Sequence, residues 1–402
     1  MKILMINHFP LAGSGSGTYT KNLAVHLNEL GHEVCIILPE NSKDYSKLEN
    51  IKLHPVFFTN EEKIDGALQF NFPCFTSHPR SIKTFSDLNE KEFDEYLDAF
   101  KKAIKQEVEE FKPDIIHGQH VWILSSLASD YDIPLILTAH GTDLMGYDKW
   151  PKFREFADRA MEKCKYVISI SKDNCELLLK LFPNYKDKIV MMRNGYDPNV
   201  FYPKEVNCEE ILDKYHIPKE EYQNKKIVTF VGKLANFKGV DILLDAIKVY
   251  EDKTDTITLI IGDGDERDKL HKQAKDLDLK SVYFIGNVDQ KELSNFYNIA
   301  SVSVVPSRRE PFGLVAIEAM AAGAPVIASN QGGLPDFVNE EVGGLVIPED
   351  KDDLANKIIE VLNRYEGDDY LNWRKKISVY ARNNYAQDKI IEELNTLYKK
   401  AI

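Results

Sequence analysis

The stretch that decides the fold of this chain begins PSRREPFGLVAIEAMAAGAPVI at Pro306 and extends to Gly344. The residues before it are apolar up to Pro306, which indicates a buried strand that leads into a loop. From Leu314 the sequence is apolar and rich in alanine, so we expect a short buried helix that begins at about Phe312-Gly313. Open parallel sheets bind ligands where their strands end. The stretch therefore predicts a binding site at the start of this helix.

Two carboxylates with seven residues between them frame this helix start: Glu310 lies in the loop, and Glu318 lies inside the apolar helix. Burial of a polar group without partners costs about 2 to 7 kcal/mol, and of a charge more, so Glu318 requires partners such as ribose hydroxyl groups. Backbone N–H groups from Phe312 to Val315 are free to bind a diphosphate. Gly313 has no side chain, so the diphosphate can come close to this backbone. Alternatively, Glu318 caps a neighbouring backbone and Glu310 is a solvated loop charge.

Length and composition indicate a soluble globular protein of two domains. The chain has 402 residues, which exceeds one usual core, with 43% hydrophobic and 29% charged residues. Its net charge of −13 argues against general nucleic-acid binding and against a basic surface for anionic lipid. It contains no run of 18 apolar residues, and its apolar start is too short for a signal peptide. The five cysteines lack metal-ligand spacing, so we expect reduced thiols in a cytoplasmic protein.

Strand-like and helical segments alternate twice along the chain, as in parallel α/β domains. The expected strands of the first series are residues 3–6, 34–38, 115–116, 135–138 and 166–170, and those of the second are 227–231, 257–261, 282–285, 302–305, 326–327 and 345–347. Turn-forming residues from Asn194 to Pro198 favour a linker between the two series. We therefore place a domain boundary near residue 199, and we expect a final helix over residues 388–400.

The Glu310 to Glu318 run resembles the Glu-x7-Glu signature of the retaining family-4 glycosyltransferases, and further segments follow in the order of that family over most of the chain. The resemblance implies the GT-B fold, an α/β fold of two Rossmann-like domains that face each other across a cleft. It assigns residues 1–198 to the acceptor and residues 199–385 to a nucleotide-sugar donor. The last helix, at 386–402, is implied to cross back to the first domain.

The first predicted strand leads into a glycine-rich turn, LAGSGSGT at residues 11–18, and then into a helix. Such a turn lets the backbone approach a phosphate or a sugar, although a flexible loop explains the glycines equally well. The turn resembles the N-terminal glycine loop of the family. Only Gly15 of the usual Gly-Gly pair carries over, because Ser14 stands at the other position. The turn is not a dehydrogenase fingerprint, since no acidic residue closes the next strand in the expected place.

Three histidines follow neighbouring predicted strands: His117, His120 and His140. A histidine at the end of a strand can aim a donor at a ligand oxygen, but each is also explained as a structural residue. The T-x-H-G-x-D sequence around His140 resembles the family motif whose histidine hydrogen-bonds the donor sugar near the reacting carbon. We therefore assign His140 to the catalytic site and expect His117 and His120 in the wall of the cleft. A zinc site is an alternative that lacks a fourth ligand.

Two lysines, Lys233 and Lys238, follow the first strand of the second series. Cations at such a turn suit a diphosphate, whose charge grows as a glycosidic bond breaks, although solvated surface lysines are the alternative. The family has Gly-Arg and a later Lys-Gly here, so Lys233 stands at the arginine position and loses its bidentate geometry. The resemblance also implies that backbone near Val288 contacts the base of the nucleotide.

The resemblance implies retention at the anomeric carbon, with the leaving phosphate accepting the proton of the acceptor. Lys233 and Lys238 would hold the diphosphate, Glu318 the ribose and Glu310 the donor sugar, so the glutamates are not a glycosidase pair. No metal or other cofactor is expected, because the lysines and the helix start carry the charge. Two other functions stay open: a GT-B-fold epimerase or hydrolase of nucleotide sugars, and a non-catalytic sugar-nucleotide sensor.

The acceptor is the partner that the sequence specifies least. An irregular, aromatic stretch from Asn60 to Asp87 is expected to face the cleft, or else to be a loop packed by its aromatic residues. Arg80, Lys149 and Arg154 suggest a small phosphorylated or carboxylated acceptor, and a growing glycan is the alternative. By the habit of the family we expect a UDP-sugar as the donor, with GDP-mannose as the next choice.

Overall fold

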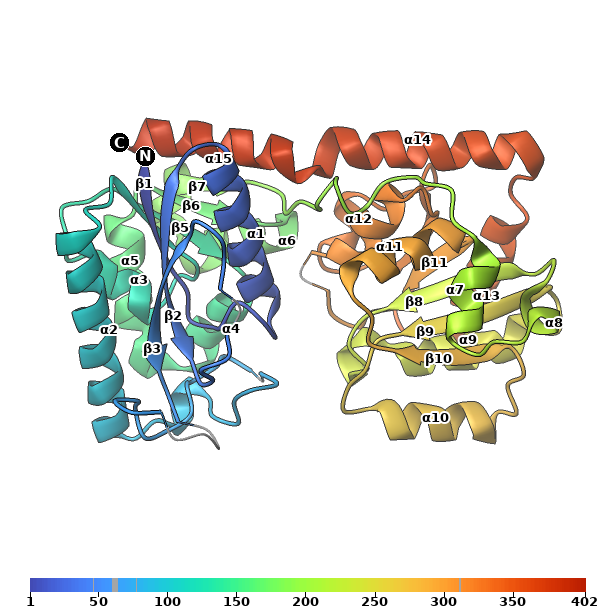
Figure 1. Ribbon diagram of the computed structural model, residues 1–402, viewed down its shortest axis with the longest axis horizontal. Coiled ribbons are helices and arrows are strands. Elements are labelled where there is room, and N and C mark those ends of the chain that lie inside the picture. Colours follow the sequence, from blue (N-terminus) through green and yellow to red (C-terminus); the bar gives the residue numbers. More distant parts are fainter. Residues whose placement is uncertain (46, 60–63, 77, 311) are drawn as a thin grey trace. The chain divides into compact units, whose positions relative to one another are not determined.

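The computed structural model describes residues 1–45, 47–59, 64–76, 78–310 and 312–402 (Figure 1). Pro311 of the quoted stretch, and residues 60–63 and 77 of the expected acceptor segment, lie outside these ranges. The chain divides into a first unit, Met1–Arg193 with Ile390–Ile402, and a second unit, Asn194–Lys389. The sequence placed these boundaries near residues 199 and 386.

The first unit contains a seven-stranded parallel sheet with the order β3-β2-β1-β4-β5-β6-β7. Its strands are β1 (Lys2–Ile6), β2 (Glu33–Glu40), β3 (Lys52–Phe57), β4 (Ile115–Gly118), β5 (Leu135–Ala139), β6 (Tyr166–Ser169) and β7 (Ile189–Met191). Every strand expected from an apolar run is present. The edge strands β3 and β7 were missed, because β3 mixes charged and apolar residues and β7 has only three residues.

Helices cover both faces of this sheet and create two apolar cores (Figure 1). On β1, Ile3 and Met5 belong to the core shared with α1 and α15, while Leu4 and Ile6 belong to the core shared with α2, α3 and α5. Strands buried on both faces read as continuous apolar runs, which is why they were predictable. The helices are α1 (Gly15–Glu29), α2 (Glu90–Glu110), α3 (Ile123–Ala128), α4 (Thr142–Lys149), α5 (Arg154–Lys163), α6 (Lys172–Leu181) and α15 (Gln387–Ala401).

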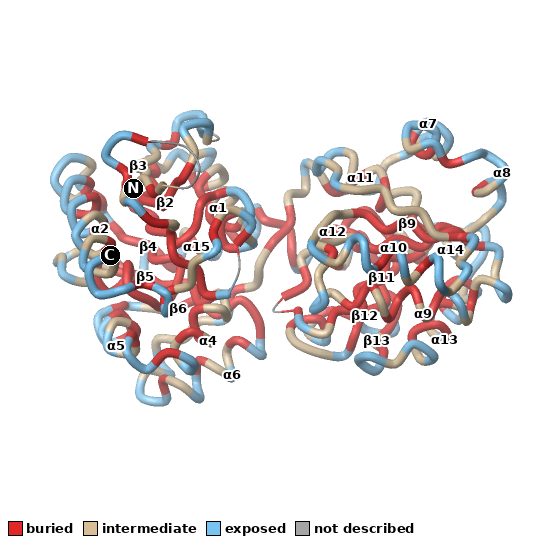
Figure 2. The backbone as a smooth tube through the Cα atoms, turned by 90° about the horizontal axis from the view of Figure 1, so that it is seen from below, coloured by how far each residue is buried: buried red, intermediate tan, exposed pale blue. Residues whose placement is uncertain are grey.

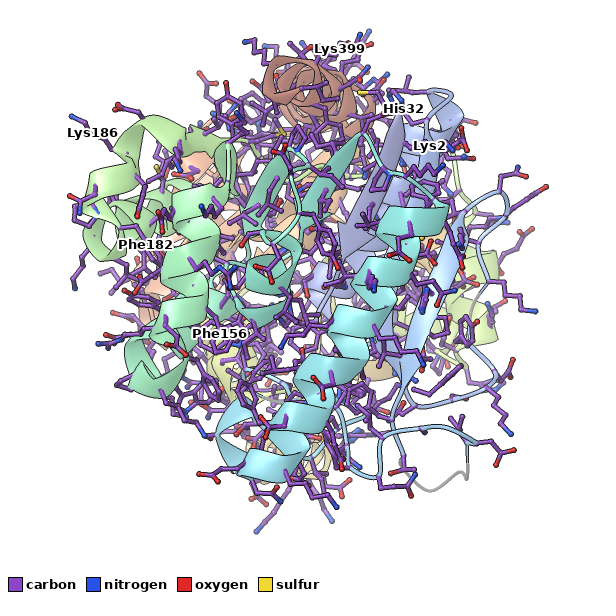
Figure 3. The ribbon with its side chains drawn as sticks, turned by 90° about the vertical axis from the view of Figure 1, so that its left-hand side faces the viewer. Lys2, His32, Phe156, Phe182, Lys186 and Lys399 are labelled. Carbon is purple, nitrogen blue, oxygen red and sulfur yellow. The ribbon has the colours of Figure 1, made fainter. Side chains whose placement is uncertain are left out.

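The C-terminal helix α15 packs on the first unit, as the resemblance implied. Leu394 and Tyr398 are fully buried in the core that α15 shares with α1. His32, in the turn after α1, donates from Nε2 to Oδ1 of Asn395 at 3.1 Å. Figure 3 shows His32 and Lys399 at the same end of this unit. The preceding helix, α14 (Gly367–Tyr385), belongs to the second unit.

The second unit contains a six-stranded parallel sheet with the order β10-β9-β8-β11-β12-β13, and its inner strands are buried (Figure 2). All six expected strands are present: β8 (Lys226–Val231), β9 (Thr256–Ile261), β10 (Val282–Gly286), β11 (Val302–Val305), β12 (Val326–Ser329) and β13 (Gly343–Val346). The other helices are α7 (Cys208–Lys214), α8 (Lys219–Tyr222), α9 (Val240–Tyr250), α10 (Arg267–Asp276), α11 (Gln290–Ile299), α12 (Leu314–Ala321) and α13 (Lys351–Leu362). The prediction of two parallel α/β domains is confirmed.

The strand order of each sheet reverses beside the first strand of its unit. β1 lies between β2 and β4, and β8 lies between β9 and β11. The connections therefore diverge at these points, and open α/β sheets bind ligands at such switch points. The loops after β1 and β4, and those after β8 and β11, are the places where the fold favours a binding site.

All five cysteines are free thiols, and Cys35, Cys74 and Cys164 are buried. Buried free cysteines behave as small apolar side chains, so these three contribute to packing. Within the ranges that the structure describes, no helix combines the length and the apolar character needed to cross a membrane.

Candidate active site

At the switch point of the second sheet, the loop after β8 meets the loop after β11. The first loop carries Lys238 and the second carries Glu310, 72 positions further along the chain. Nζ of Lys238 donates to Oε2 of Glu310 at 2.5 Å, and only 18% and 10% of these side chains are exposed. The structure thus brings two of the predicted site residues together as an ion pair.

Glycines let the loops around this pair pack closely. Gly239 has a φ of 68°, and a Cβ atom there would lie 2.0 Å from the carbonyl oxygen of Pro306. A Cβ atom on Gly332 would lie 2.0 Å from the carbonyl oxygen of Glu310, which accepts the N–H of Gly333 at 3.0 Å. The Gln-Gly-Gly run at 331–333 therefore supports the backbone of Glu310.

Helix α12 begins just after Glu310. Gly313 is its N-cap with a φ of 98°, and a Cβ atom there would lie 2.5 Å from Cδ2 of Leu334, so both conformation and space require glycine. Leu314 and Val315 are half-buried residues of the first turn, whose N–H groups have no partner within the helix. The backbone expected to bind an anion is therefore close to the Lys238–Glu310 pair.

Glu318 lies inside α12, and only 7% of the residue is exposed. Burial raises the pKa of its carboxyl group to about 8, and contact with the Tyr297 hydroxyl offsets only part of this increase. At pH 7 the side chain is mostly protonated, so it can donate as well as accept a hydrogen bond. A carboxyl group perturbed by burial beside a switch point is typical of a functional site.

Three further residues expected to bind the donor lie in the second unit. Nζ of Lys233 pairs with Oδ2 of Asp265 at 3.2 Å, with 38% and 86% of the side chains exposed. A surface pair of this kind contributes little to stability, so Lys233 can exchange Asp265 for another anion. Val288 follows β10 and packs partly buried against the core around β9. Phe312 is buried, with its ring centroid 5.9 Å from that of Phe337.

In the first unit, the T-x-H-G-x-D motif runs from the last two residues of β5 into the first turn of α4. Asp143 is fully buried; its Oδ1 accepts the N–H of His140 at 3.1 Å, and its Oδ2 accepts the N–H of Val121 at 2.8 Å. Asp143 thus joins the loops that carry His140 and His120. Burial raises its pKa to about 6. Sequence reasoning gave this residue no role, although an acid at a helix start after a buried strand was the available signal.

His140 is half-buried, and its ring packs beside polar and aromatic groups. Its Nε2 donates to Oε1 of Gln119 at 3.3 Å, and its ring centroid lies 4.9 Å from that of His120 and 5.2 Å from that of Tyr19. Burial lowers the pKa of His140 to about 3. The imidazole is therefore neutral at pH 7 and is a weak base, with one N–H, which donates to Gln119, and one nitrogen that can accept a hydrogen bond.

The expectation that His117 and His120 line a cleft was wrong, because both are fully buried. The ring nitrogens of His117 hydrogen-bond to the hydroxyl groups of Tyr398 at 2.7 Å and Thr138 at 2.8 Å. His120 packs among aromatic rings, including that of Phe75. Both are core residues. Across the described part of the chain, no three His, Cys, Asp or Glu side chains are grouped so that they could hold a metal ion.

Comparison with known proteins identifies the family. Residues 13–200 match the family model described as Glycosyltransferase Family 4, and residues 213–383 match the model described as Glycosyl transferases group 1. The first range contains His140, and the second contains Lys238, Glu310 and Glu318. The chain is a family-4 glycosyltransferase.

Related proteins match this glycosyltransferase over nearly its whole length. An uncharacterized glycosyltransferase of Methanocaldococcus jannaschii is 28% identical, over 100% of this chain and 99% of that protein. Sucrose-phosphate synthase from Thermosynechococcus elongatus has a TM-score of 0.75 at 23% identity, over 100% and 98% of the two chains. Anabaena HepE in complex with UDP has a TM-score of 0.77 at 19% identity, over 100% of both chains. The fold is therefore the GT-B fold, as expected.

The glycine loop of the glycosyltransferase forms the N-terminus of α1. Oγ of Ser14 accepts the N–H of Gly17 at 3.0 Å and so caps the helix. A Cβ atom on Gly17 would lie 2.2 Å from the carbonyl oxygen of Pro10, whereas one on Gly15 would meet no atom within 4 Å. Gly17 is thus required for packing. Gly15, the residue carried over from the family, leaves an exposed stretch of backbone.

Arg80, one of the basic residues expected at the acceptor, forms an ion pair with Glu40 at the end of β2. Its Nε also donates to Oδ1 of Asn41 at 3.0 Å. Arg80 and Glu40 line a pocket of about 110 Å³ together with Lys21 and Tyr45. The charge of Arg80 is therefore largely balanced within the protein, and Lys21 adds a second cation to this pocket.

Arg154 and Lys149, the other two basic residues, are engaged around the end of α4. Nε and Nη2 of Arg154 donate to the carbonyl oxygens of Tyr147 at 2.8 Å and Asp148 at 3.0 Å. Nζ of Lys149 lies 5.2 Å from the ring centroid of Trp150. Arg154 thus satisfies the last carbonyl groups of α4, which is a structural role.

Replacement of Glu318 by glutamine is expected to stabilise the glycosyltransferase at high pH. Because folding raises the pKa of Glu318 from 4.5 to about 8, the stability linked to its proton is full below pH 4.5 and is lost as the pH rises through 8. The free energy of unfolding is measured in urea at pH 5 and at pH 9. Its decrease between these pH values should be smaller in Glu318→Gln than in the wild type, by on the order of 4 kcal/mol. The exposed Glu341→Gln is the control, and equal behaviour of both variants would contradict the burial argument.

Proposed function

We propose that the protein is a retaining hexosyltransferase that moves a sugar from a nucleoside diphosphate to an acceptor hydroxyl group. A UDP-sugar is the favoured donor, and GDP-mannose is the next choice. The observation that carries this proposal is the Lys238–Glu310 pair, held at 2.5 Å beside the start of α12. A cation for phosphate next to a carboxylate for sugar hydroxyls matches the order of groups in a nucleotide sugar.

The charge on the diphosphate would be balanced by the protein itself. In the proposed complex, Lys238 contacts the phosphate attached to the sugar, because its partner Glu310 binds the sugar. Lys233 and the N–H groups of residues 312–315 contribute the remaining donors, and the charge they stabilise grows as the glycosidic bond breaks. We therefore propose that no metal ion is obligatory. Ribose hydroxyl groups would supply the polar partners that buried Glu318 requires.

Proton transfer would involve the leaving phosphate rather than a side chain. His140 has a pKa lowered to about 3 by burial, so it is a poor base. Its one N–H, which donates to Gln119 in this structure, would turn to a sugar hydroxyl group when the donor binds. Glu310 is paired with Lys238 and serves in binding. With neither residue acting as the base, the leaving phosphate is the group that accepts the acceptor proton. This arrangement supports front-face attack with retention at the anomeric carbon.

The acceptor is proposed to be a small phosphorylated or carboxylated molecule, with a growing glycan as the second choice. A pocket of about 110 Å³ beside the glycine loop supports the small molecule. Lys21 would be its cation, because Arg80 is already paired with Glu40 and Asp44 also lines the pocket. Leu11 and Ala12 of the glycine loop line this pocket together with Leu38 of β2 and Leu53 of β3. The pocket is therefore on the β2 and β3 side of the first sheet.

Thermal unfolding with nucleotides tests the proposed donor. At 100 times its Kd, UDP should stabilise the protein by about 2.7 kcal/mol, which raises the Tm by about 5 to 10 °C. Lys238→Ala should lose most of this increase, whereas Lys248→Ala, at an exposed lysine of α9, should keep it. A larger increase with GDP would replace UDP as the donor nucleotide. No increase with UDP, GDP or ADP would refute the proposed function.

A further inference from the structure

Arg308, two residues before Glu310, joins the two loops of the proposed donor site. Its Nη1 and Nη2 donate to the two carboxylate oxygens of Asp241, at 2.8 Å and 2.7 Å. Asp241 lies in the first turn of α9, directly after the loop that carries Lys238. Arg308 therefore reaches from the loop after β11 to the segment that follows β8.

Further contacts of Arg308 hold the Lys238 loop by its backbone. Nη1 donates to the carbonyl oxygen of Asn236 at 2.7 Å, and the backbone N–H donates to the carbonyl oxygen of Phe237 at 2.9 Å. Nε donates to Oε2 of Glu349 at 3.0 Å. The two residues immediately before Lys238 are thus bound to one arginine.

We propose that Arg308 is a positioning residue that fixes Lys238 at the phosphate next to the transferred sugar. The inference rests on the proposed function, in which Lys238 binds that phosphate. Without the side chain of Arg308, the loop would keep its lysine and the backbone bonds to Phe237, but would lose the side-chain contacts to Asn236 and Asp241. Lys238 would then have to be ordered at the moment of binding, at an entropic cost.

The charges around Arg308 show that it positions rather than binds. Asp241 and Glu349 both pair with its guanidinium, so its positive charge is already balanced. Hydrogen bonds and the charge of Arg308 overcome the effect of burial on Asp241 and hold the pKa of this carboxyl group below its usual value. The pair is therefore ionised at neutral pH. Lysine cannot replace this fork of parallel hydrogen bonds.

Calorimetric titration of Arg308→Lys with UDP and with UMP tests the inference. UMP lacks the second phosphate, so it does not report on Lys238. We expect the affinity for UDP to fall about 10-fold, the size of one lost charge-assisted contact, and the affinity for UMP to stay within about 2-fold. Arg364→Lys is the matched control, because Arg364 is also a largely buried arginine with two carboxylate partners. It should bind both nucleotides like the wild type.

A second variant keeps the test decisive if Arg308→Lys does not fold. Asp241→Asn removes the partner charge and should give the same selective loss of UDP affinity. Both substitutions break the same contact between residues 308 and 241. In the double variant, the loss of UDP affinity should therefore exceed the larger of the two single losses by no more than about 2-fold. Unchanged UDP affinity, or equal losses for UDP and UMP, would overturn the positioning role. GDP and GMP replace this pair if GDP is the donor nucleotide, and the proposed function itself fails if the wild type binds no nucleoside diphosphate.

Discussion

Glu310→Ala should lower the rate of sugar transfer by at least about 100-fold, the usual size of one lost transition-state contact. The structure adds a second, separable expectation for this variant. Glu310 is the partner of Lys238 at 2.5 Å, so its removal leaves a largely buried lysine without its carboxylate. That lysine should then bind an anion more favourably, so the affinity for UDP should stay the same or increase.

Two measurements on the same protein check this expectation. The rate is followed by the release of UDP in the presence of acceptor, and the affinity for UDP is measured by calorimetry. The exposed Glu341→Ala serves as the control and should match the wild type in both. A near-normal rate in Glu310→Ala would remove Glu310 from the site. A large loss of UDP affinity would mean that Glu310 acts by supporting the loop rather than by contacting the sugar.

Mild acid should destabilise the first unit through four histidines whose pKa values are lowered by folding. Burial lowers the pKa of His8, His117 and His140 to about 3, and that of His120 far below its ordinary value of 6.5. Since these pKa values are lowered by folding, the linked stability is full above pH 6.5 and is lost as the pH falls below it. The raised pKa of Asp143, about 6, works in the opposite direction. The effect of the four histidines outweighs that of Asp143. The free energy of unfolding should therefore fall by on the order of 5 kcal/mol at pH 5.

Urea unfolding at pH 7.5 and pH 5 measures this loss, with Trp122 and Trp150 as fluorescent reporters in the first unit. His120→Phe should reduce the difference in unfolding free energy by about 2 kcal/mol, because His120 packs among rings such as that of Phe75. His216→Asn changes an exposed histidine of the second unit and should have no effect on it. Equal free energies of unfolding at the two pH values would show that folding does not lower the pKa values of these four histidines.

The fold was largely predictable from the sequence because the inner strands are buried on both faces. Runs such as residues 3–6 are continuously apolar and are followed by polar residues, so they can be recognised in the sequence. The edge strand β3 escaped detection, since Lys52, His54 and Pro55 interrupt its apolar pattern. An edge strand has only one neighbour, so its composition is less constrained.

The site was predictable only in its parts. Lys238 and Glu310 were each assigned from their local motif, but their ion pair depends on strand order, which the sequence does not state. Asp143 and Arg308 received no role, because the partners that define them lie 22 and 67 positions away. Arg80 was read as a free cation for the same reason, since its partner Glu40 lies 40 positions before it.

The most direct test of the proposed reaction is to incubate the wild-type enzyme with a UDP-hexose, with and without a pool of candidate acceptors, and to identify every product by mass spectrometry and NMR. The proposal predicts that UDP is released together with a new glycoside, only when the acceptor is present, and that the anomeric configuration of the donor is kept. A changed sugar nucleotide or free hexose formed from the donor alone, without any glycoside, would contradict it.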